Sequence, residues 1–169
     1  MLSKIVKIGA YLYILICIQS CKLYKFTDAS VNPNLKTIAV NNIPNLSPIV
    51  VPSLSNTVTE GLKDKFLRET NLKLSNIGAD IEFNGSIIQY NIDPVSITNV
   101  ATVAQNRLTI SIKIECTNRV EPLKGFSQTF TDGENYDATK DLNSIEDDLI
   151  TTITDRIIQN IFNKAFVNW

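Results

Sequence analysis

The sequence predicts an α+β fold, a two-layer sandwich in which two helices pack on one face of a mixed or antiparallel sheet of roughly four strands. Two observations support this prediction. Several segments alternate apolar and polar residues with the period of two that strands show, and two longer segments repeat apolar residues every three or four positions, as amphipathic helices do. At 169 residues the chain is long enough for one core without disulfides.

The first strands are predicted from β-branched and alternating residues. Residues 35–43 place Ile38 and Val40 on one face, and residues 71–75 form a shorter strand candidate. Residues 81–92 alternate and then change phase at Ile87 and Ile88, which predicts a β-bulge. We expect Gly85 to lie at the resulting kink.

Residues 107–117 form the clearest predicted strand. One face is apolar and the other polar, with Thr109, Ser111, Lys113 and Glu115. The sheet is therefore expected to cover a core on one side and to meet solvent or a partner on the other. Cys116 continues the apolar series, so we interpret it as a small buried hydrophobe rather than a redox group. Residues 123–131 repeat the alternation and close a hairpin through the turn at 121–122.

Two helices are predicted from apolar stripes. In the first, Ser53 or Ser55 is expected to cap a helix that runs to about residue 69, with Leu54, Val58, Leu62 and Phe66 four residues apart. Gly61 within it predicts a close approach to another backbone. In the second, Ser144 is expected to cap residues 145–166, whose first turn holds three acidic residues that suit the helix dipole.

The composition excludes several classes of site. The chain has no histidine, which removes Ser-His-Asp and Cys-His nucleophile systems and histidine-bearing zinc sites. Its net charge of -1 argues against nucleic acid as a partner. Residues 132–137 hold three carboxylates but lack the later glycine and the terminal glutamate of a calcium loop, so an ordinary polar loop is expected there. We predict no cofactor, no metal and no enzymatic activity.

The N-terminus predicts a lipoprotein signal peptide over residues 1–20. Lys4 and Lys7 precede an apolar run over residues 8–18, which spans only about 16 Å as a helix, short of the ~30 Å hydrocarbon core. Ser20 before Cys21 completes a lipobox-like pattern. We therefore expect the chain to be cut just before Cys21 and this cysteine to be lipidated. The alternative is an uncleaved anchor that ends at Cys21. Residues 21–34 are then a tether, and residues 35–169 the folded domain.

Lipidation at Cys21 accounts for the cysteine content. The remaining cysteines are Cys17, which leaves with the signal peptide, and Cys116. No acidic residue directly follows Cys21, so neither an inner-membrane retention signal nor a surface-display signal is present. The expected location is the outer membrane, with the domain facing the periplasm.

Four strings resemble the LptE family in the form found in Bacteroidetes. They are TEGLKDKFLRETNLKL at 59–74, NRLTISIKI at 106–114, SIEDDLI at 144–150 and IFNKAFVNW at 161–169. The resemblance implies a lipopolysaccharide-assembly lipoprotein with two helices on a four-stranded sheet. It further implies that the chain plugs the β-barrel of LptD, assists the folding of that barrel and helps to pass lipopolysaccharide to the outer leaflet.

The resemblance also implies lipopolysaccharide contacts by basic side chains on or near the sheet. Arg107, Lys113 and Arg119 are the candidates, because each is basic and lies near the long hairpin. For each, an ordinary solvated charge is the alternative. A second function from another class also stays open: a periplasmic lipoprotein adaptor that binds a different envelope protein and never contacts lipopolysaccharide.

Overall fold

The structure is a computed structural model that describes residues 31–95 and 104–167. The predicted signal peptide, Cys21 and residues 22–30 of the tether lie outside the described residues. The chain forms β1 (Thr37–Val40), α2 (Leu54–Glu69), β2 (Lys73–Leu74), β3 (Ile81–Val95), β4 (Gln105–Asn118), β5 (Phe126–Asp137) and α3 (Glu146–Phe166). Short 3₁₀ turns, η2 (Pro122–Lys124) and η3 (Leu142–Ser144), precede β5 and α3.

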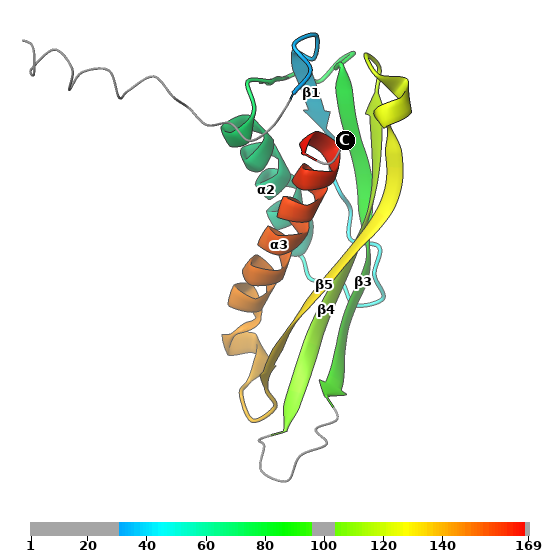
Figure 1. The fold of residues 1–169 in the computed structure, drawn as a ribbon. Coiled ribbons are helices and arrows are strands. Elements are labelled where there is room, and N and C mark those ends of the chain that lie inside the picture. Colours follow the sequence, from blue (N-terminus) through cyan, green and yellow to red (C-terminus); the bar gives the residue numbers. More distant parts are fainter. Residues whose placement is uncertain (1–30, 96–103, 168–169) are drawn as a thin grey trace, which may run out of the picture.

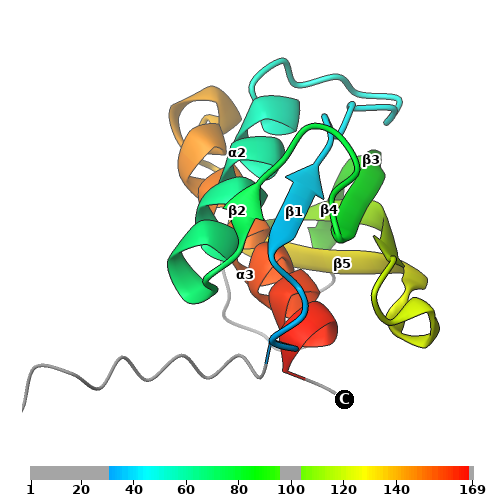
Figure 2. The ribbon, with the colours of Figure 1, turned by 90° about the horizontal axis from the view of Figure 1, so that it is seen from above.

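The elements form two layers, which confirms the predicted α+β sandwich. Helices α2 and α3 lie side by side over one face of a sheet with the order β2-β1-β3-β4-β5 (Figure 1). β1 runs parallel to β2 and β3, whereas β3, β4 and β5 are antiparallel. The sheet has five strands rather than four, because the two residues of β2 pair with the start of β1 at the sheet edge (Figure 2).

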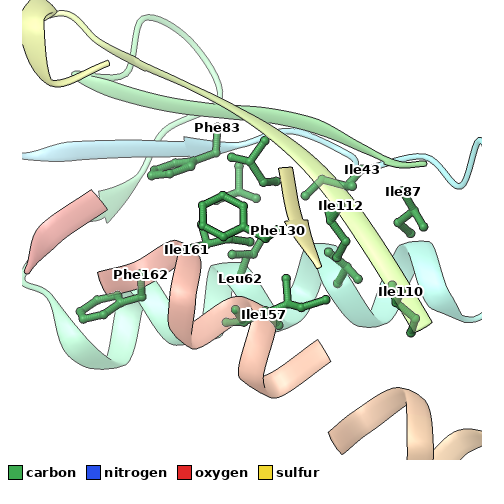
Figure 3. Packing of buried hydrophobic residues seen from close by; sticks show 14 of the residues in the cluster. Ile43, Leu62, Phe83, Ile87, Ile110, Ile112, Phe130, Ile157, Ile161 and Phe162 are labelled. Carbon is green, nitrogen blue, oxygen red and sulfur yellow. The ribbon is translucent and has the colours of Figure 1, made fainter. Parts of the chain in front are cut away.

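The core lies between the helix stripes and the inner sheet face (Figure 3). Phe66 of α2 is fully buried, and its ring centroid lies 4.6 Å from that of Phe83 and 5.6 Å from that of Phe166. Cys116 is only 3% exposed, which confirms its interpretation as a buried hydrophobe. Each buried large apolar side chain contributes about 1.5–3 kcal/mol, so the helix stripes found in the sequence suffice to hold the layers together.

The predicted bulge in β3 is present, and Gly85 has another role. The pairing with β4 shifts register between Ile87 and Gln89, and Ile88 is left 43% exposed. Gly85 lies before this shift in regular pairing, so its placement at the kink was wrong. A Cβ at Gly85 would lie 2.5 Å from the carbonyl oxygen of Lys113. Glycine is needed there because β3 and β4 approach too closely for a side chain.

The expectation of a polar loop from residue 132 was also wrong, because β5 continues to Asp137. Two inward-facing carboxylates of this stretch form ion pairs with one arginine of α3. The Arg156 guanidinium lies 2.7 Å from Asp132 and 2.8 Å from Glu134. Burial raises the pKa of Asp132, but the hydrogen bonds from Arg156 and from the Gly133 N–H outweigh it and hold that pKa below its usual value. The ion pairs let acidic residues occupy the inner face of a strand.

The helix starts differ from the predicted caps. Ser53 holds the N-cap position of α2 without a side-chain capping bond, and the Ser55 hydroxyl donates instead to the carbonyl of Ile43. Ser144 lies in η3, so α3 follows a 3₁₀ turn rather than a serine cap. Gly61 does mark a close contact, but with a side chain: its Cβ would lie 2.6 Å from Cδ1 of Ile158. Among the described helices, none is long and apolar enough to cross a membrane.

A polar sheet face as the candidate functional site

The sheet face opposite the helices is a polar surface built by the alternation of β3, β4 and β5. Polar residues of the three strands align in rows across it, for example Ser86, Lys113 and Thr129. The face that the sequence predicted on residues 107–117 is therefore shared by three strands. We call this surface the polar face; its exposed members include Gln89, Arg107, Lys113, Glu115, Thr117, Ser127, Thr129 and Thr131.

The structure places Arg107, Lys113 and Arg119 on the same side of the molecule but does not bring them together. Arg107 and Lys113 are six residues apart on β4, which corresponds to about 20 Å along a strand. Arg119 follows the end of β4, a similar distance beyond Lys113. The three side chains therefore form a line along the polar face, and no two converge on one ligand atom.

Lys113 is the best placed of the three to contact an anionic group. It lines a shallow hollow of about 270 Å³ together with Asn84, Ser86 and Glu115. Among the described residues, no acidic side chain forms an ion pair with Lys113. The lysine is exposed, and the Ser86 hydroxyl beside it can donate a hydrogen bond to an anionic oxygen. The Asn84 carboxamide already donates to Glu82 at 3.4 Å, and the Glu115 carboxylate at the same hollow opposes an anion.

Arg119 and Arg107 are engaged within the protein. The Arg119 guanidinium lies 3.2 Å from Oε2 of Glu82, and the other carboxylate oxygen, Oε1, accepts from the Asn41 carboxamide at 2.9 Å. Arg107 donates to the Asn135 carboxamide at 2.9 Å. Both side chains remain exposed, so a ligand could reach them, but its anionic group would compete with the existing partner.

The middle of the polar face is closed by a hydrogen-bonded row that the sequence did not reveal. Ser111 is only 3% exposed, although it lies on this face. Its hydroxyl bonds to Gln89 at 2.9 Å and to the Thr131 hydroxyl at 2.8 Å. The alternation of apolar and polar residues in β4 correctly placed Ser111 on the polar face. Its burial depends on how β3 and β5 pair with β4, and the pattern of one strand does not contain that register.

A second hollow lies at the end of the molecule where the described chain begins. It has a volume of about 550 Å³ and is lined by residues 31–33 and 35–37, before and at the start of β1, and by residues 69–73, from the last residue of α2 into β2. Sequence reasoning missed it, because it forms between segments that are far apart in the chain. Over the described ranges, no cluster of acidic or cysteine side chains has the arrangement to hold a metal ion.

Comparison with protein families decides the membership of the chain. A family model named LptE, with the description lipopolysaccharide-assembly, matches residues 35–165, which include every helix and strand described above except the last residue of α3. The chain belongs to the LptE family. The expected family is thus confirmed, and membership supports a role in lipopolysaccharide assembly in the bacterial envelope.

Solved structures resemble this LptE-family chain in fold. A hypothetical protein of Chlamydia trachomatis matches with a TM-score of 0.53 at 8% identity, over 79% of this chain and 99% of that one. A minor lipoprotein of Acinetobacter baumannii matches with a TM-score of 0.45 at 15% identity, over 77% and 91% of the two chains. The rare lipoprotein B of Shewanella oneidensis matches with a TM-score of 0.42 at 14% identity, over 75% of this chain and 93% of that one. No curated protein sequence matches.

Proposed function

We propose that this LptE-family chain is an outer-membrane lipoprotein that partners an LptD-like β-barrel, as its plug and folding aid, in the transport of lipopolysaccharide to the cell surface. The observation that carries the proposal is the family match over residues 35–165, which covers nearly the whole two-layer domain. Residues 1–20 are the signal peptide, residues 21–34 the tether, and Cys21 the lipidated residue in this proposal.

The proposed activity is binding, without covalent chemistry. The absence of histidine from the whole chain supports this, because the chain then lacks the usual general base near neutral pH. A flat polar face with separated cations suits an extended anionic amphiphile better than a small substrate, which binds in a concave pocket. Lys113 is the proposed contact to a lipopolysaccharide phosphate, and Arg107 and Arg119 are proposed to contribute further along the face.

The lipopolysaccharide contact is tested on the purified full-length lipoprotein. We expect Lys113→Ala to lower the binding of fluorescent lipopolysaccharide several-fold, because the hollow loses its cation. The matched control is Lys63→Ala in α2, which removes a lysine paired with Glu60 in the helix layer. Equal binding by wild type and both variants would remove Lys113 from the site.

The alternative function, a periplasmic adaptor that never contacts lipopolysaccharide, differs in its partner. A tagged copy of the full chain, extracted in mild detergent, is expected to bring down an LptD-like barrel together with lipopolysaccharide, both identified by mass spectrometry. Recovery of another envelope protein without barrel and without lipopolysaccharide would favour the adaptor and defeat the transport proposal.

A further inference from the structure

Exposed apolar side chains gather at the end of the molecule where the described chain begins. The connection from β2 to β3 carries Ile77, which is 90% exposed, and η2 carries Leu123, which is fully exposed. These two loops are neighbours, because the Arg119 N–H donates to the Asp80 carbonyl at 2.8 Å. The start of β1 lies beside them, since the Thr37 N–H donates to the Asp80 carboxylate at 2.9 Å (Figure 1).

The exposure of these side chains is of a kind that marks an interaction surface. Single exposed apolar residues are common, but here Leu74 and Val120 add to Ile77 and Leu123 at the same end, at 46% and 36% exposure. Both Ile77 and Leu123 occupy connections between strands, where no packing requirement of the core calls for a large aliphatic side chain. We call this end the proximal end, defined by residues 31–37, 68–82, 117–126 and 163–167.

The two ends of the molecule carry opposite charge. At the proximal end six basic residues outnumber four acidic ones: Lys36, Arg68, Lys73, Arg119, Lys124 and Lys164 against Glu69, Asp80, Glu82 and Glu121. The opposite end, residues 91–95, 104–107 and 135–148, is acidic: Asp93, Asp137, Asp141, Glu146, Asp147 and Asp148 against Arg107 and Lys140. An anionic surface would therefore attract the proximal end and repel the other.

The chain before Val31 brings this end close to any lipid anchor. Nine residues separate Cys21 from Val31. Even when fully extended, the chain from Cys21 to Val31 spans at most about 35 Å, which is less than the roughly 50 Å length of the 15-residue strand β3. A bilayer that holds the lipid on Cys21 is thus within reach of Ile77 and Leu123.

We propose that the proximal end docks on a phospholipid bilayer with anionic headgroups, with Ile77 and Leu123 entering the interface and the surrounding lysines and arginines lying at the headgroups. The proposal concerns the lipoprotein before it engages a barrel, and it rests on the proposed lipidation of Cys21. Docking holds the long axis of the domain away from the membrane, with its acidic end outermost. The lipid anchor and the docked end together then fix the orientation of the domain relative to the membrane.

The test measures how deeply each end enters the bilayer. Leu123→Cys and, as the matched control at the acidic end, Ala138→Cys provide exposed thiols for an environment-sensitive dye. Burial raises the pKa of the native Cys116 thiol to about 12, so that thiol stays protonated and unreactive at neutral pH. The full-length lipidated protein is reconstituted in vesicles of phosphatidylethanolamine and phosphatidylglycerol, some with brominated chains.

We expect brominated lipid to quench the dye at position 123 several-fold more strongly than the dye at position 138. High salt and Lys73→Glu should each weaken this quenching, whereas Lys140→Glu at the acidic end should leave it unchanged. The salt titration is done on the dye-labelled Leu123→Cys protein alone. It therefore tests the proposal even if Lys73→Glu does not fold. Equal or absent quenching at both positions would overturn the proposal. So would quenching at position 123 that appears only after a barrel partner is added.

Labelling of the wild-type protein separates this proposal from the one on which it rests. If Cys21 is lipidated, the wild type takes up no dye under the labelling conditions. Dye on Cys21 would defeat the anchor, and with it the route that brings the domain to the membrane. A blocked Cys21 without quenching at position 123 would defeat the docking alone and leave the proposed function standing.

Discussion

Asp80 ties the beginning of β1 to the beginning of β3 through a single carboxylate oxygen. Its Oδ2 accepts hydrogen bonds from the N–H groups of Lys36 and Thr37 and from the Thr37 hydroxyl, each at 2.9 Å. The backbone hydrogen bonds from Lys36 and Thr37 hold the pKa of Asp80 below its usual value. No sequence pattern singled out Asp80, because its partners lie more than forty residues earlier in the chain.

The lowered pKa of Asp80 gives a pH dependence of defined sign. The ionised carboxylate stabilises the folded state above the unfolded pKa of about 3.9, and this stability is lost as the pH falls through the lower folded pKa. We expect Asp80→Asn to lower the denaturant midpoint at neutral pH and to make it less dependent on pH between about 5 and 2. Asp64→Asn on the exposed side of α2 is the control. An unchanged acid profile in Asp80→Asn would show that this carboxylate does not link folding to pH.

At the scale of elements, a segment was predictable when its own residues carry its pattern. β4 and α3 were found from internal alternation and from one apolar stripe, and the bulge in β3 from a change of phase. The second half of β5 was missed because its inward carboxylates are compensated by Arg156, more than twenty residues away. Ser53 does occupy the predicted N-cap position of α2, but neither predicted serine caps that helix with its side chain, and the Ser55 hydroxyl donates outside α2 to the carbonyl of Ile43.

The pairing of β3 with β4 depends on Gly85. We expect Gly85→Ala to destabilise the fold by about 1–3 kcal/mol, because the new Cβ would meet the backbone carbonyl of Lys113 at 2.5 Å. Backbone cannot yield as a flexible side-chain end would. Urea unfolding measures the change in the free energy of unfolding. The control is Ser86→Ala at the next residue, whose side chain lies on the polar face, and it should leave that free energy nearly unchanged. A neutral Gly85→Ala would show that the two strands separate easily at this point.

At the scale of the whole molecule, the fold and the family were predictable, and the site was predictable only in outline. The polar face was expected from residues 109–115, and Lys113 lies on it in a hollow. The pairing of Arg119 with Glu82 and the buried row at Ser111 arise from strand register, which no local pattern encodes. The opposite charge of the two ends also appears only when the fold brings distant segments together.

The anchor gives a prediction for the intact protein in its cell. We expect Cys21→Ala to leave the domain folded but to abolish lipid labelling and to release the protein from the membrane fraction, because the anchor is lost. Metabolic labelling with a palmitate analogue and fractionation measure both effects, and circular dichroism checks the fold. A lipid-labelled, membrane-bound Cys21→Ala protein would contradict the assignment of the anchor to this residue.

The measurement that tests the account most directly is the amount of lipopolysaccharide at the cell surface after depletion of this protein. We expect surface lipopolysaccharide to fall as the protein is depleted, and to recover when the wild-type chain is supplied. A cell depleted of the protein that keeps a normal amount of lipopolysaccharide at its surface would contradict the central claim.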